Sequence, residues 1–165
     1  MITFVPMEKK HHYSATIRWT GNQGTGTSGY ADYTRSHTVN IQGKPELSCS
    51  SDIPFRGDGS LHNPEDFFLT AIASCHMLWY LHLCADAGVI VTSSTDHPEG
   101  ILEQNSDGSG RFTGVDLHPY VEVSEESMLP VAAALHEKAH QKCFMANSCN
   151  FPVRHRAVIG VNTPE

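Results

Sequence analysis

Two cysteines in separate helix-like segments are the residues of this chain best suited to chemistry. Cys75 lies midway along an apolar segment at residues 63–88, and Cys143 lies within a second segment at residues 129–146. A long apolar helix would hold a thiol at a fixed depth in a core. A second thiol on a distant helix could then close a disulfide with it. The pair therefore points to thiol redox chemistry rather than to a cross-link that stabilises a small scaffold.

A reactive Cys75 would need a nearby cation, because the thiolate is the form of cysteine that attacks. Cys75 lies ten residues after Glu65, too far into its helix for the helix dipole to help much. Arg35 and Arg56 are the candidate cations, and Arg18 is a weaker one. An arginine buried beside the thiol would itself need a carboxylate, which Glu65 could supply. The alternative interpretation is that Cys75 is only a small buried hydrophobic residue.

Two histidines precede Cys143 at helical spacing. His136 and His140 lie seven and three residues before it, so all three would share one helix face. This arrangement is typical either of a resolving thiol or of a His-His-Cys zinc site. The string HEKAH at residues 136–140 also matches the His-Glu-x-x-His motif of zinc hydrolases, although so short a motif often arises by chance. A polar seam on a half-exposed helix is the remaining interpretation.

The other cysteines and two helix histidines are expected to have structural roles. Cys49, Cys84 and Cys149 are interpreted as structural or incidental thiols. His76 and His82 lack the spacing of a metal site with a clear third ligand, so we expect them to be satisfied core or surface residues.

Composition restricts the class of protein. The chain has 165 residues, 39% of them apolar, which suits one domain over residues 1–165. The net charge of −7 argues against a nucleic-acid surface. Five cysteines without a visible signal peptide favour a cytoplasmic protein with reduced thiols. Polar residues interrupt the longest apolar stretch, residues 67–91, so we expect a core helix and no membrane span.

The long helix has clear boundary signals. Asn63 is a good N-cap, Pro64 suits the first helical position, and Glu65 and Asp66 complement the helix dipole in the first turn. Gly88 is a natural left-handed stop. A helix of this length, apolar around much of its circumference, is usually buried centrally, often against a copy of itself.

Strand-like runs surround the two helices. The order of strands, helix, strands, helix and strand predicts an α+β fold in which an antiparallel sheet packs on long central helices. The expected strands are residues 13–19, 38–41, 46–49, 89–95, 100–104, 110–116, 118–124 and 151–161.

From about residue 13 onward the chain resembles the OsmC/Ohr family of osmotically inducible and organic hydroperoxide resistance proteins. The resemblance rests on the Asn-Pro-Glu-Asp-Phe run at 63–67, on Ala-Ser-Cys at 73–75, and on Ala-His-Gln-Lys-Cys at 139–143. Residues 74–84 are most similar to an OsmC-like subgroup. The resemblance implies an intertwined homodimer with two active sites at the subunit interface. It also implies a thiol peroxidase that uses no metal, haem or flavin.

By motif position, the resemblance implies a role for each site residue. Cys75 would be the peroxidatic thiol, Cys143 the resolving thiol, and Glu65 the carboxylate that holds an arginine near the thiolate. Arg35 suits that arginine best, and Arg56 is the second choice. The implied partners are a small hydroperoxide and a dithiol reductant of the lipoyl type, with neither nucleic acid nor membrane.

Three questions stay open at the level of sequence. A zinc-binding, hydrolase-like site on His136, His140 and Cys143 is one alternative function, and a non-catalytic stress or binding protein on the same fold is another. Cys149, just past the second helix, is a second candidate for the resolving thiol.

Overall fold

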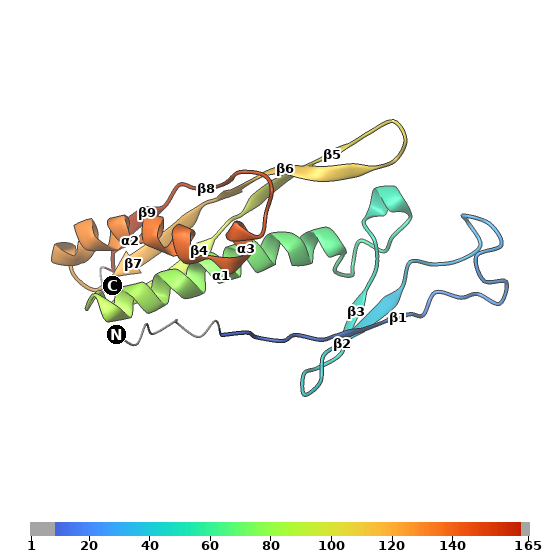
Figure 1. The fold of residues 1–165 in the computed structure, drawn as a ribbon, viewed down its shortest axis with the longest axis horizontal. Coiled ribbons are helices and arrows are strands. Elements are labelled where there is room, and N and C mark those ends of the chain that lie inside the picture. Colours follow the sequence, from blue (N-terminus) through green and yellow to red (C-terminus); the bar gives the residue numbers. More distant parts are fainter. Residues whose placement is uncertain (1–8, 163–165) are drawn as a thin grey trace, which may run out of the picture. The chain divides into compact units, whose positions relative to one another are not determined.

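The computed structural model describes residues 9–162, which fold into two compact units (Figure 1). The first unit ends at Pro64 and the second begins at Glu65. The single domain expected over residues 1–165 stays a prediction.

The first unit is built on a three-stranded antiparallel sheet. Its strands are β1 (Thr16–Trp19), β2 (His37–Asn40) and β3 (Leu47–Cys49), paired in that order. A short 3-10 helix, η1 (Ile53–Phe55), follows and ends at Arg56 in the left-handed region, with a φ of 63°. The three early strands and their antiparallel pairing confirm the prediction, with ends that differ by up to three residues.

The second unit begins with the long helix α1 (Pro64–Asp86), close to its predicted bounds. Glu65 and Asp66 occupy its first turn as expected. Gly88 has a φ of 73°, and across it the N–H of Val89 donates to the Cys84 carbonyl at 2.8 Å. The predicted left-handed stop is therefore confirmed.

Two three-stranded sheets follow α1, and each mixes antiparallel and parallel pairs. Strands β4, β7 and β9 form one sheet, and β5, β6 and β8 form the other; the third pair of each sheet, β7–β9 and β6–β8, is parallel. The predicted antiparallel pairing is confirmed for β4–β7 and β5–β6 but was wrong for β6–β8 and β7–β9. The chain reaches β8 and β9 through a helical crossover, which permits parallel pairing. The strands are β4 (Val91–Asp96), β5 (Glu99–Gln104), β6 (Gly110–Leu117), β7 (Pro119–Val123), β8 (Val153–His155) and β9 (Val158–Val161).

The crossover consists of η2 (Glu126–Met128), α2 (Leu129–Lys142) and α3 (Phe144–Asn147). The predicted second helix was thus too long: it breaks at Cys143, whose φ of −66° and ψ of 109° are extended. The single predicted strand at residues 151–161 is likewise two strands, and each one joins a different sheet.

Helix α1 contributes to two hydrophobic clusters. Tyr80 and Cys84 pack with residues of β7 and α2, whereas Ile72 and Ala73 pack with residues of β6 and β8. Figure 1 shows α1 and α2 running beside these strands. Among the described residues, α1 is the helix long and apolar enough to cross a membrane by length and composition, and a core helix passes the same test. Only 22% of its apolar window is buried, which leaves much of its apolar surface exposed in a single chain.

Candidate functional site

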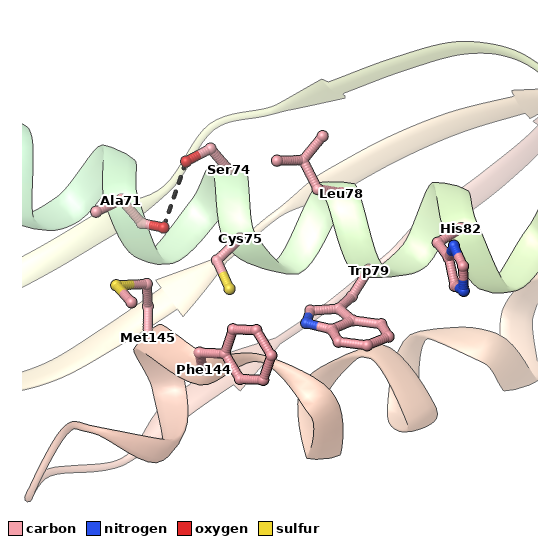
Figure 2. A pocket seen from close by; sticks show the side chains of 8 residues that line it. All are labelled: Ala71, Ser74, Cys75, Leu78, Trp79, His82, Phe144 and Met145. Carbon is pink, nitrogen blue, oxygen red and sulfur yellow. Dashed lines mark hydrogen bonds between the residues drawn. The ribbon is translucent and has the colours of Figure 1, made fainter. Parts of the chain in front are cut away.

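An apolar pocket of about 480 Å³ opens between α1 and α3 (Figure 2). Its α1 residues recur at helical spacing, so one face of the helix forms one wall. The polar side-chain groups in the wall are the Ser74 hydroxyl, the Cys75 thiol, the Trp79 indole N–H and the His82 imidazole. The lining residues are Ala71, Ser74, Cys75, Leu78, Trp79, His82, Phe144 and Met145.

Cys75 is the nucleophilic residue of this pocket. It is half-buried, and Figure 2 shows its sulfur directed from α1 towards Phe144 and Met145. Its thiol lies close enough to Cys143 to help raise the pKa of the Cys143 thiol. The structure therefore brings together the two thiols that the sequence singled out, and it leaves one of them accessible from the pocket.

Cys143 is fully buried at the break between α2 and α3. Its sulfur accepts a hydrogen bond from the Ala146 N–H at 3.4 Å and lies 3.9 Å from the Ile72 carbonyl oxygen. Burial raises the pKa of the Cys143 thiol to about 11, and the neighbouring Cys75 adds to the increase. At neutral pH, Cys143 is thus a protonated thiol that also caps α3.

The aromatic side chain of Trp79, which lines the pocket, is contacted by three other side chains. The ring of Trp79 contacts the rings of Phe144 and His82 edge-on, each with centroids 5.6 Å apart. Lys142 Nζ lies 5.3 Å from the Trp79 ring centroid, within cation–π range. His82 is exposed and pairs with Asp86 at 3.4 Å, which confirms the surface role expected for it.

The candidate arginines belong to the first unit. The Arg35 guanidinium stands 4.3 Å from the Tyr30 ring centroid and 4.2 Å from that of Tyr33. Its Nη1 donates to the Tyr33 carbonyl at 2.8 Å, and its buried Nη2 has no hydrogen-bond partner within residues 9–162. Arg56 is exposed and lies farther from Tyr30, at 5.9 Å. Glu65 is half-buried in the first turn of α1. The roles predicted for these three residues stay predictions.

The alternative zinc site on His136, His140 and Cys143 is not formed. Within the described part of the chain, no group of three His, Cys, Asp or Glu side chains is placed to hold a metal ion. His136 instead pairs with His76, and its ring stacks on Tyr80 at a centroid distance of 3.8 Å. The shared helix face of His136, His140 and Cys143 failed to predict ligands because the helix breaks at Cys143.

A cluster of buried histidines escaped the sequence interpretation. His76 was expected to be a satisfied core or surface histidine. It is buried, but only its Nε2 has a partner, the Nδ1 of His136 at 3.1 Å. His155 of β8 completes the cluster, with its ring centroid 5.4 Å from that of His76. The excess of eleven histidines was visible in the sequence, but the contacts join three elements far apart in the chain.

Cys49 and Cys84 are buried, as expected for structural thiols. Cys149 is half-buried, and its thiol donates to the Met145 carbonyl at 3.2 Å. The backbone partner favours a local structural role for Cys149 over that of a second resolving thiol.

Comparison with known proteins places this site in context. A family profile described as "OsmC-like protein" matches residues 57–156. An OsmC-like protein of unknown function from Vibrio cholerae is 31% identical, with a TM-score of 0.79 over 90% of this chain and 100% of its own. No curated protein matches the sequence.

Two more distant structures share the fold. An organic hydroperoxide resistance protein from Elizabethkingia anophelis is 19% identical and has a TM-score of 0.68 over 94% of this chain and 100% of its own. One from Legionella pneumophila is also 19% identical, with a TM-score of 0.66 over 93% and 100%.

Proposed function

The chain belongs to the OsmC-like protein family, and on that premise we propose that it is a cysteine-based thiol peroxidase that reduces organic hydroperoxides. The observation that carries the proposal is the neighbouring pair formed by half-buried Cys75, in an apolar pocket, and fully buried Cys143. Two proteins with this fold are named organic hydroperoxide resistance proteins, which supports the choice of substrate.

The first chemical step oxidises Cys75. Its thiolate attacks the terminal peroxide oxygen, an S–O bond forms, and the O–O bond breaks. The leaving alkoxide takes a proton and departs as the alcohol. Cys75 remains as a sulfenic acid, oxidised by two electrons.

The second step joins the two cysteines. The Cys143 sulfur attacks the sulfenic sulfur, the S–O bond breaks, and the hydroxyl leaves as water with the Cys143 proton. The raised pKa of Cys143 keeps that proton in place until this step. A dithiol reductant of the lipoyl type then restores both thiols by exchange and becomes a disulfide itself.

An arginine is proposed to stabilise the Cys75 thiolate and to polarise the peroxide. Arg35 is the first candidate, because Tyr30 and Tyr33 hold its guanidinium and one of its buried nitrogens has no partner among the described residues. Arg56 is the alternative. Glu65 is proposed to orient the arginine by a charge-assisted hydrogen bond.

The pocket favours organic hydroperoxides over hydrogen peroxide. Leu78, Trp79, Phe144 and Met145 line it with apolar atoms, which gain by burying an organic group but gain little from hydrogen peroxide. No metal, haem or flavin is needed for the steps above, and the cytoplasm remains the expected location.

A direct test follows the fate of cumene hydroperoxide. Wild-type protein with dihydrolipoamide should turn over continuously, and Cys75→Ser should produce no alcohol above the uncatalysed rate. Cys143→Ser should produce one equivalent of alcohol and then stop or trap a mixed disulfide with the dithiol, because the sulfenic acid has no internal partner. Cys149→Ser is the matched control and should turn over like the wild type.

The single-turnover measurement separates the peroxidase from a poorly chosen reductant. Reduced wild-type protein without dithiol should still form one equivalent of alcohol. If it forms none, or if Cys75→Ser retains turnover, the peroxidase proposal fails, and a non-catalytic binding role becomes the better interpretation.

A further inference from the structure

A pair of buried histidines joins the two helices that carry the cysteine pair. His76 directly follows Cys75 on α1, and His136 lies two turns before Cys143 on α2. The two side chains are only 1% and 2% exposed, and His76 Nε2 lies 3.1 Å from His136 Nδ1. We propose that this pair is an acid-sensitive latch that holds α1 against α2, and that its protonation opens the contact and exposes Cys143.

The donors and acceptors of the two imidazole rings match each other only when both rings are neutral. A neutral imidazole has one N–H donor and one bare nitrogen acceptor. The contact between the rings uses one of each, whichever ring donates. The outward nitrogens, His76 Nδ1 and His136 Nε2, are then one donor and one acceptor, both buried and without a hydrogen-bond partner in residues 9–162. An added proton makes both of them donors and brings an unpaired charge into the core.

The side chains around the pair offer this charge no compensation. Tyr80 of α1 stacks on His136, and burial raises the pKa of the Tyr80 hydroxyl, so it stays neutral. His140 of α2 and His155 of β8 face the pair and would repel it when protonated. Glu137 of α2 is the nearby acid, but it is largely exposed and pairs with His155 at 3.7 Å.

The direction of the pH effect follows from burial. Desolvation, with repulsion from neighbouring histidines, lowers the pKa of His76 from 6.5 to about 4 and that of His136 to about 3. In an opened state both rings would meet water and titrate near 6.5. The latch is therefore intact above pH 6.5 and is lost as the pH falls from there towards 4. Because the open state binds protons more tightly, each histidine lowers the ratio of closed to open protein by about thirtyfold at about pH 5, compared with neutral pH.

The thiol of Cys143 reports the opening. Reduced protein is labelled with 4,4′-dithiodipyridine, which reacts with thiols in acid, at about pH 7.5 and about pH 5. The rate at Cys143 is divided by the rate for the same residue in guanidinium at each pH, which removes the pH dependence of the labelling chemistry. In wild-type protein this ratio should rise by at least about thirtyfold at the lower pH.

The variants separate the latch from general acid sensitivity. Glutamine keeps a polar side chain that does not titrate, so the double variant His76→Gln/His136→Gln should lose most of the pH response. His82→Gln removes an exposed histidine from the same helix and should respond like the wild type. If wild-type labelling is unchanged by acid, or if the double variant responds as strongly as the wild type, the proposal fails.

A measurement on unmodified protein covers the case in which the double variant does not fold. Proton NMR should show the imidazole signals of His76 and His136 at neutral positions down to about pH 5. Titration of either buried histidine near 6.5 in folded protein would overturn the latch. The readouts need neither peroxide nor reductant, so they do not depend on the proposed peroxidase activity.

Discussion

At the scale of residues, the tyrosine-held arginine offers a sharp test of the proposed thiolate site. Arg35→Lys keeps the positive charge but loses the flat guanidinium that two rings contact. We expect the second-order rate of alcohol formation from cumene hydroperoxide to fall by about tenfold or more, because a preorganised cation supports charge in the transition state. Stopped-flow single-turnover measurements would check this.

Arg56→Lys is the matched control for this substitution. Arg56 is exposed and farther from Tyr30, so its replacement should change the rate little. If Arg56→Lys is slow and Arg35→Lys is fast, Arg56 is the arginine that activates Cys75.

Residue types predicted the thiol pair, but they did not predict its environment. Cys75 and Cys143 could be singled out because few side chains can act as nucleophiles, and the structure does bring them together. The contact between His76 and His136 could not be foreseen, because it depends on how α1 and α2 pack. The HEKAH string wrongly suggested a zinc site for a related reason. Residue spacing on a helix face does not reveal which side chains pack opposite that face.

At the scale of elements, the end of α1 depends on one left-handed glycine. Gly88→Ala would place a side chain at a φ of 73°, which is disfavoured even though no atom lies within 4 Å of the new Cβ. We expect the free energy of unfolding to fall by about 1 kcal/mol, as measured by urea denaturation.

Gly114→Ala in β6 is the control for this prediction. Its Cβ would make only an ordinary contact, 3.7 Å from Arg154 Nη1, without a left-handed backbone. Equal destabilisation by both substitutions would mean that α1 does not end through the backbone geometry of Gly88.

Element boundaries were predictable where a local signal exists and were missed where it does not. Asn63, Pro64 and Gly88 mark the ends of α1, and the structure follows them closely. The break after Lys142 has no glycine or proline, because the Cys143 side chain itself caps the next turn. The parallel pairing of β8 with β6, and of β9 with β7, was missed because strand partners far apart in the sequence leave no local signal.

At the scale of the whole molecule, the exposed apolar surface of α1 is what we expect for the homodimer that the family resemblance implies. Leu78 of α1 is 62% exposed, and placing a charge there would be costly if a second copy covers the helix. We therefore expect wild-type protein to sediment as a dimer and Leu78→Lys to shift it towards monomer.

Ile101→Lys is a matched control for the dimer, because Ile101 of β5 is also 62% exposed. It should leave the sedimentation coefficient unchanged. A monomeric wild type, or a Leu78→Lys variant that remains dimeric, would contradict a dimer built on this face of α1.

If Cys143 forms the proposed disulfide with Cys75, its capping role would link the oxidation state of the protein to the shape of the pocket. The sulfur that receives the Ala146 N–H also anchors the turn bearing Phe144 and Met145, which form one pocket wall. A disulfide from that sulfur to Cys75 would draw the sulfur towards α1 and weaken its hydrogen bond with the Ala146 N–H. The wall would then be well ordered in the reduced protein and less ordered once the alcohol has formed. This loss of order would favour release of the alcohol in each cycle.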